Sequence, residues 1–310
     1  MAAAATARGR TSPEEKDIMM RVVVPIDSMT DAASVIPDAL RLVGPDGELV
    51  LIRNPGPFPK SQRETPGDER QQGADKEQTA RDIAAALSDR GVAVRVPEIH
   101  DELEDDLFTA ASALDADMIV VAARDLDPRR KLAPGSKLHT TMAQSPVPIL
   151  VSRPNGTRVL SHPRLLVPLD GSESAESVLP LAESLAMDWN TCLWLTQVVP
   201  VPALSASEAW ARTLAYLESV ARTLHCDVRV NVITGRSVPT MLIRTARDWA
   251  VTDVVLASHG HTARSHHAIG NVTERLIQHL HCRIVVVPPA AAASMRFTGS
   301  AGRDVPVLPR

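Results

Sequence analysis

The chain has 310 residues, a formal net charge of −4 and 23% charged residues. This balance leaves no basic field for nucleic acid, and no apolar run reaches the roughly 18 residues that a membrane helix requires. The length suits two domains of ordinary size. Cys192, Cys226 and Cys282 lack metal-ligand or CxxC spacing, which predicts free thiols and a cytoplasmic protein.

A repeated pattern divides the chain into two halves. The run Arg21–Ser28 (RVVVPIDS) has a near copy at Arg164–Ser172 (RLLVPLDGS). A second shared pattern, DMIVVA at 117–122 and DVVLA at 253–257, follows in each half. The chain is therefore predicted to be a tandem repeat of one α/β module.

Short β-branched runs alternate with amphipathic helical patterns along both halves. In the first half the expected elements are Val22–Ile26, Ser34–Val43, Glu48–Ile52, Asp75–Ser88 and Val92–Val96. In the second half they are Leu165–Leu169, Ala175–Ala186, Cys192–Val199, Glu208–Leu224, Asp227–Val232, Val238–Trp249, Asp253–Leu256, Val272–Leu280 and Arg283–Val287. This alternation predicts βαβ units, with a five-stranded parallel sheet in each half covered by helices on both faces.

Composition sets the expected boundaries. Residues 1–19 and 289–310 are rich in Ala, Pro, Gly and Arg and are predicted to be disordered tails. The first domain is expected at 20–153, a linker at 154–163 and the second domain at 164–288. The Pro-, Gly- and charge-rich stretch 54–73 is expected to be an irregular loop after the second strand.

Ligands of open parallel sheets bind beyond the carboxyl ends of the strands, where helix N-termini offer N–H groups to anions. After the fourth strand of the second half the sequence reads ASHG at 257–260, then nine residues, then GNVT at 270–273, which opens a helix. Glycines at such points let the backbone approach a phosphate closely. The pattern predicts a phosphate-binding loop.

These motifs resemble the universal stress protein family, whose nucleotide-binding members carry Gly-x2-Gly-x9-Gly-Ser/Thr after the fourth strand and an Asp after the first. The resemblance covers nearly all of residues 20–288, twice. It implies two tandem Rossmann-like domains, each a sheet of order 3-2-1-4-5. It also implies pairing of domains through their fifth strands, here 148–151 and 284–287, and binding of ATP or a related adenine nucleotide.

The resemblance assigns roles to residues of the second half. Asp170 would accept from the adenine or ribose, Val198 or Val199 would flank the base, and Mg²⁺ could accompany ATP. The full candidate set is Pro168, Leu169, Asp170, Val198, Val199, Ala257, Gly260, Gly270, Asn271, Val272 and Thr273. Two positions depart from the family pattern: Ala257 replaces the first glycine and Asn271 replaces the Ser or Thr.

A purely structural reading of the same residues stays open. Asp170 would then cap the following helix, and Gly260 and Gly270 would serve turns. In that case the protein would be a nucleotide-free interaction module. A slow ATP hydrolase is a further alternative, although none of the GxSxG, GxxxxGK[ST], GxGxxG or HExxH motifs occurs and catalysis is not expected.

The first half keeps the spacing of the motif but less of its chemistry. Ala122 and Asp125 replace both early glycines, whereas Gly135-Ser136 survives. A carboxylate about 4 Å from a phosphate charge repels it by about 4 kcal/mol at an effective dielectric near 20. The first half, with Asp27 at its first strand, is therefore expected to hold a degenerate site and to pair with the second. Separated halves would expose apolar edges and self-associate.

Six histidines lie near the end of the second half, at positions 259, 261, 266, 267, 279 and 281. None of them has zincin spacing and no Cys or Glu completes a ligand set, so no metal site is predicted. His261, Arg264, His266 and His267 are instead candidate donors to phosphate oxygens.

Overall fold

A computed structural model describes residues 20–26, 28–53, 66–97, 107–123, 142–153, 163–200, 206–260 and 269–294. The strands are β1 Arg21–Ile26, β2 Glu48–Arg53, β3 Ala93–Arg95, β4 Met118–Ala122, β5 Ile149–Ser152, β6 Arg164–Pro168, β7 Cys192–Pro200, β8 Val228–Gly235, β9 Asp253–Ala257 and β10 Arg283–Val287. The helices are α1 Met29–Val43, α2 Pro66–Ser88, α3 Leu107–Ala113, α5 Glu173–Glu176, α6 Leu179–Asp188, α7 Ala206–Ala221, α8 Val238–Asp248, α9 Asn271–His279 and α10 Pro289–Ser294.

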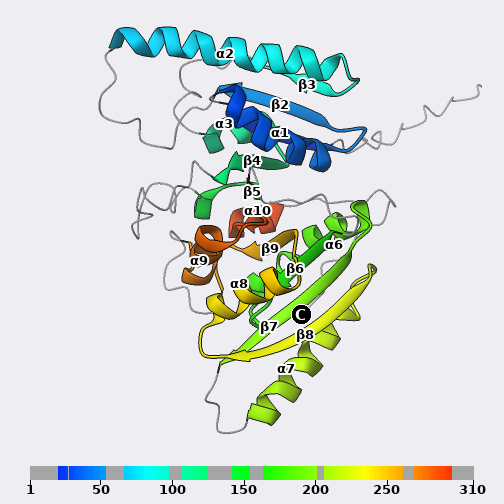
Figure 1. Ribbon diagram of the computed structural model, residues 1–310. Helices are drawn as coiled ribbons and strands as arrows, with labels where there is room; N and C mark the ends of the chain where they lie inside the picture. The colour runs from blue at the N-terminus through cyan, green and yellow to red at the C-terminus, as the bar shows by residue number, and fades with distance from the viewer. Residues whose placement is uncertain are drawn as a thin grey trace, which may run out of the picture.

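All ten of these strands form one sheet, in the order β3-β2-β1-β4-β5-β10-β9-β6-β7-β8. Each half therefore has the expected order 3-2-1-4-5, and the strands within a half run parallel. The two halves lie one above the other in Figure 1, with β5 at the junction. There β5 pairs with β10 antiparallel, Leu150 opposite Val285, which confirms the expected contact through the fifth strands.

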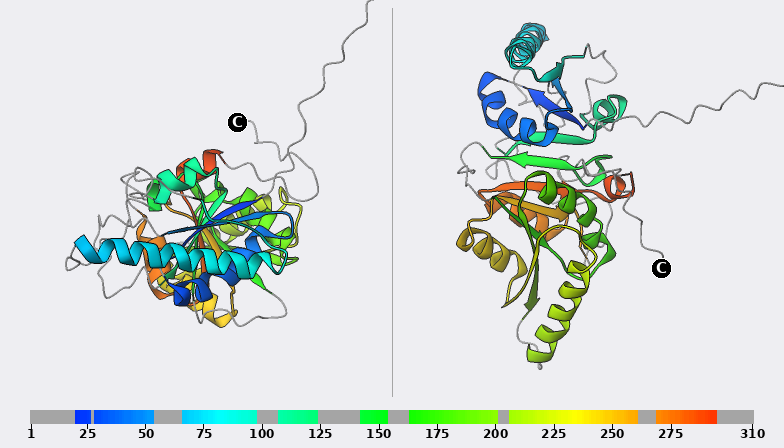
Figure 2. Two further views of the ribbon diagram at one scale, coloured as in Figure 1. Left: turned by 90° about the horizontal axis from the view of Figure 1, so that it is seen from above. Right: turned by 90° about the vertical axis from the view of Figure 1, so that its right-hand side faces the viewer.

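Helices cover both faces of the sheet, as Figure 2 shows. Successive strand residues point to opposite faces. Val22 and Val24 accordingly pack in one core with side chains of α1, α2, α6 and α7, and Val23 packs in the other with α3, α8 and α9. Because β5 and β10 contribute to both cores, the cores run continuously from one half to the other.

Buried charges cross the junction between the halves. The Arg283 guanidinium at the start of β10 binds Asp38 of α1 (Nη1–Oδ1 2.8 Å) and Asp253 of β9 (Nε–Oδ1 2.5 Å). Ser152 donates to Asp38 Oδ2 at 2.6 Å, and Arg41 reaches Asp253 Oδ2 at 3.3 Å. Burial by itself lowers the pKa of Arg283, but Asp253 and Asp38 raise it above its ordinary value. The network fixes α1 of the first half against the second half.

Two helices differ from expectation. The helix expected from Ser34 begins at Met29 instead, and Ala32 in the added turn is buried. The single helix expected over 175–186 is broken into α5 and α6, because Pro180 lies in the first turn of α6 and cannot continue the preceding turn.

Two segments predicted to be irregular are partly helical. α2 begins at Pro66, within the loop expected at 54–73, and α10 occupies 289–294, within the expected tail. Both helices begin with a proline, which needs no N–H donor at that position. Ala291 of α10 is fully buried against the core. Residues 1–19, 54–65, 154–162 and 295–310 lie outside the described part of the chain.

The three cysteines are free thiols, and Cys282 is the most deeply buried. Burial raises the pKa of Cys282 to about 12 and that of Cys226 to about 11. At pH 8 the Cys282 side chain would therefore stay in the thiol form, and the thiolate is the reactive form. We expect iodoacetamide to label Cys282 last in the folded chain and faster at higher pH, as followed by peptide mass spectrometry. Labelling of Cys282 at the rate of Cys192 in the folded chain would contradict this burial.

Candidate functional site

A cavity of about 410 Å³ opens at the carboxyl ends of β6, β7 and β9. It lies where the chain connections diverge, since β6 is followed in the sequence by β7 on one side but pairs with β9 on the other. Such switch points are where open α/β sheets bind ligands. The lining residues are Pro168, Leu169, Asp170, Ala175, Thr196, Val198, Val238, Leu242, Leu256, Ala257, His259, Gly260, Ile269, Gly270, Asn271, Val272 and Thr273.

The cavity collects ten of the eleven residues expected from the sequence; Val199 is not among its lining residues. Val198 and Val199 are neighbours on β7 and therefore point to opposite faces of the sheet. Val198 packs in the core on the side of α8 and α9.

Asp170 lies two residues after the end of β6, and its two carboxylate oxygens have different neighbours. Its Oδ1 accepts hydrogen bonds from the Ser172 N–H (3.0 Å) and hydroxyl (2.6 Å). Its Oδ2 lies toward Gly260, where an added Cβ would stand only 2.5 Å away. The N-cap of α5 is Ser172, whose Oγ accepts from the Ala175 N–H at 3.1 Å. Asp170 therefore supports the cap without being the cap, and Gly171, at φ +82°, provides the left-handed turn between them.

The two motif glycines differ in what they allow. Gly260 gives Asp170 room for its carboxylate, because a Cβ at position 260 would force that carboxylate aside. Gly270 is the N-cap of α9, with φ −65° and no side-chain cap, and an added Cβ there would lie 3.4 Å from the Ser258 carbonyl oxygen, in ordinary contact. Of the two glycines, only Gly260 lies so close to the Asp170 carboxylate that a side chain there would have to displace it.

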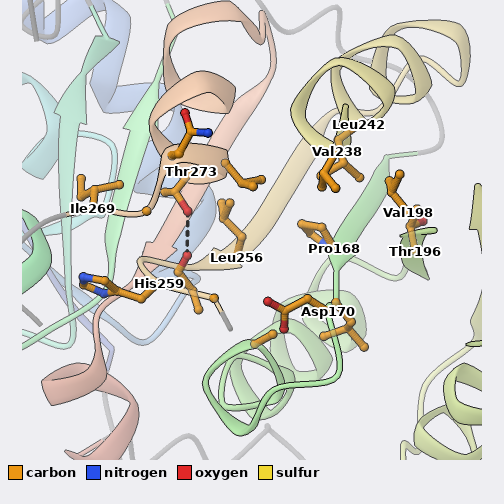
Figure 3. A pocket seen from close by; sticks show the side chains of 17 residues that line it. Pro168, Asp170, Thr196, Val198, Val238, Leu242, Leu256, His259, Ile269 and Thr273 are labelled. Carbon is orange, nitrogen blue, oxygen red and sulfur yellow. Dashed lines mark hydrogen bonds between the residues drawn. The ribbon is translucent and has the colours of Figure 1, made fainter. Parts of the chain in front are cut away.

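Hydrogen bonds join the described residues just after β9 to the starts of α5 and α9. The Thr273 hydroxyl donates to the Ala257 carbonyl at 3.0 Å, as the dashed line in Figure 3 shows. The Ser174 hydroxyl donates to the His259 carbonyl at 2.9 Å, and the Gly270 N–H to the Ser258 carbonyl at 2.8 Å. These contacts hold the N-terminus of α9 and the start of α5 against residues 257–259.

The histidines separate in the structure. His259 is buried in the cavity wall, with Nδ1 2.7 Å from the Ser258 hydroxyl. His279 and His281 lie at the other end of α9 and are exposed. His261, Arg264, His266 and His267 lie outside the described residues, as do Asp27, Asp125, Gly135 and Ser136 of the first half. Within the described ranges, no three His, Cys, Asp or Glu side chains form a group that could hold a metal ion.

Seven lining residues were not expected in this site from the sequence: Ala175, Thr196, Val238, Leu242, Leu256, His259 and Ile269. Thr196 could have been found, because it precedes Val198 by two positions on the same strand face. Val238 and Leu242 are one helical turn apart on α8 and share a face. No sequence signal indicates that this face lines the same cavity as the residues just after β9.

The protein consists of two doubly wound α/β domains in tandem, joined edge to edge through β5 and β10. The model of the universal stress protein family matches residues 19–153 and 162–288. The chain therefore belongs to the universal stress protein family. No curated protein matches it at a significant level.

Solved structures agree on the fold. A universal stress protein from Archaeoglobus fulgidus DSM 4304 is similar at a TM-score of 0.65 and 17% identity, covering 86% of this chain and 96% of its own. A protein of Pseudomonas aeruginosa UCBPP-PA14, described as a putative universal stress protein, reaches 0.60 and 14%, covering 89% and 95%. A universal stress protein in complex with cAMP matches 42% of this chain at 15% identity and a TM-score of 0.33, covering 98% of its own.

No helix in the described ranges is both long and apolar enough to span a bilayer.

Proposed function

We propose that the second half of this universal stress protein binds an adenine nucleotide, ATP or a related one, in the cavity beside Asp170, and that binding serves regulation. The observation that carries the proposal is the change in character along the cavity. One end lies at Gly270 and the N-terminus of α9, and the other end is lined by the apolar side chains of Val198, Val238 and Leu242. A nucleotide likewise has an anionic end, its phosphates, which suits a helix N-terminus, and a flat base, whose faces suit apolar side chains.

The N-terminus of α9 would receive the phosphates. The first N–H that bonds within this helix is that of Glu274, to the Gly270 carbonyl at 2.9 Å. The preceding N–H groups, of residues 271–273, belong to the open first turn, which carries a partial positive charge. Gly270 leaves the approach to them free of a side chain. Helix N-termini of this kind are common phosphate sites.

The opposite end of the cavity would receive the base. Val198 of β7 and Val238 and Leu242 of α8 line it, and in Figure 3 they lie away from Thr273 and His259, with Asp170 between the two groups. Apolar side chains can sandwich the faces of a base, while a carboxylate is a good acceptor for ribose hydroxyls. Asp170 Oδ2 is the candidate acceptor.

The two departures from the family pattern leave the cavity open. Its volume of about 410 Å³ is measured with the Ala257 and Asn271 side chains in place, and it falls in the range of small-molecule pockets. Asn271 is exposed at the first position of α9 and retains an amide donor. A magnesium ion would arrive with the nucleotide and be held chiefly by its phosphates.

The first half would act as a structural partner in the cytoplasm, where the three thiols stay reduced. Its α1 supplies Asp38 and Arg41 to the charge network that meets β9 and β10. Because β9 also forms one wall of the nucleotide cavity, these contacts of the first half would help to hold that wall in place.

Thermal unfolding of the whole chain tests the proposal. A ligand that binds only the folded state at one hundred times its Kd adds about 2.7 kcal/mol of stability. We expect ATP, ADP or cAMP to raise the melting temperature by several degrees, and CTP at the same concentration to leave it unchanged. Equal melting curves with and without every adenine nucleotide would instead favour a nucleotide-free interaction module.

A further inference from the structure

One side chain at the apolar end of the cavity is polar, buried and without an evident structural purpose. Thr196 of β7 has 0% exposed surface, and its Oγ1 finds no hydrogen-bond partner among the described residues. Such orphaned hydroxyls are rare in folded proteins, and each asks for an explanation. Thr196 also lines the cavity, so a ligand bound there could supply the missing hydrogen-bond partner.

The backbone of Thr196 is paired within the sheet on both sides. Thr196 pairs with Pro168 of β6 and Asn231 of β8, and its carbonyl accepts from the Leu169 N–H at 2.9 Å. The strand would be served equally by valine, which is β-branched and lacks the polar atom. Packing alone therefore gives no reason for a hydroxyl at this position.

The position of Thr196 relative to the other lining residues indicates what its hydroxyl meets. Thr196 precedes Val198 by two positions on the same strand face, and the two lie side by side in Figure 3. The helix N-terminus suited to phosphates lies across the cavity, and Asp170 lies between. Thr196 therefore lies at the end of the cavity proposed for the base, away from the end proposed for the phosphates.

We propose that Thr196 determines base specificity: its hydroxyl hydrogen-bonds the polar edge of the base that packs against Val198. This deepens the proposed function and rests on it. A threonine hydroxyl can both donate and accept, so it pairs with either an amino group or a ring nitrogen of the base. The site would favour a base that forms a hydrogen bond with the Thr196 hydroxyl over a base that leaves this hydroxyl buried and unpaired.

The test compares Thr196→Val, which removes only the hydroxyl, with Thr196→Ser, which keeps it. We expect Thr196→Val to weaken ATP binding about tenfold and Thr196→Ser by much less. The unliganded Thr196→Val protein should melt at the same or a higher temperature than the wild type, because an unsatisfied buried hydroxyl has been replaced by a methyl group. A role in the fold alone would not produce this pair of results.

The same titrations with 2′-deoxy-ATP and 3′-deoxy-ATP separate base from sugar. The loss caused by Thr196→Val should persist with both analogues; its disappearance with either one would assign the hydroxyl to the ribose and overturn the inference. Unchanged ATP affinity in Thr196→Val, or a lower melting temperature without ligand, would also overturn it. If the wild-type chain binds no ATP, the proposed function fails first and the inference falls with it.

Discussion

Replacing Asp253 by asparagine is expected to destabilise the folded chain by about 3–5 kcal/mol, the usual cost of breaking a buried ion pair by removing one partner. Asp253 is fully buried and accepts from Arg283 Nε (2.5 Å) and Nη2 (3.0 Å), from Arg41 (3.3 Å) and from the Thr252 hydroxyl (2.7 Å). An asparagine amide would turn donors toward two arginines and leave their charges under-compensated. Denaturant unfolding followed by tryptophan fluorescence measures the change.

Asp248→Asn is the matched control for that experiment. Asp248 is exposed on α8 and pairs with Arg244 one helical turn away, at 3.3 Å. Exposed pairs of this kind contribute a few tenths of a kcal/mol. We expect the control to unfold within about 0.5 kcal/mol of the wild type. An Asp253→Asn chain as stable as the control would show that the network does not hold the halves together.

Replacing Gly270 by aspartate is expected to weaken ATP binding at least about 100-fold while leaving the chain folded. Two unit charges about 4 Å apart repel by about 4 kcal/mol at an effective dielectric near 20. The new carboxylate would also occupy the N–H groups of the first turn of α9. Aspartate is a preferred N-cap and its Cβ has room, since the nearest atom is 3.4 Å away, so stability should hold or rise.

The charge effect can be separated from the effect of size. Gly270→Asn has the same shape, is also a good N-cap and carries no charge. We expect it to lose much less ATP affinity than Gly270→Asp, as measured by calorimetry. Adenosine, which has no phosphate, should bind both variants equally. Equal ATP affinity in the Asp and Asn variants would mean that the phosphates lie elsewhere.

Much of the fold followed from the sequence because its signals are local. The repeats around Pro25 and Pro168 mark the same strand in both halves, and alternation of strand and helix patterns predicts the parallel sheet. The strand order and the pairing of fifth strands came from the family resemblance. The start of α2, before Asp75, and the whole of α10 were not expected, because both stretches are rich in proline or glycine, although proline suits the first turn of a helix.

The candidate site was also largely predictable, because its residues follow strand ends. What the sequence could not supply depends on distant contacts. Arg283 and Asp38 are 245 positions apart, and nothing in either segment indicates that they meet. To decide that Val198 rather than Val199 lines the cavity, one must know which face of β7 packs toward α8. The buried hydroxyl of Thr196 becomes notable only once its surroundings are known.

Calorimetric titration of ATP with magnesium into the intact chain, and into Asp170→Ala and Asp27→Ala variants, shows whether the second half alone holds a nucleotide. Asp27 is the first-half counterpart of Asp170 in the repeat and serves as the matched control. We predict one ATP per chain, lost with Asp170→Ala and retained with Asp27→Ala. No binding by the intact chain at two different temperatures, or loss of binding with Asp27→Ala instead, would contradict this claim.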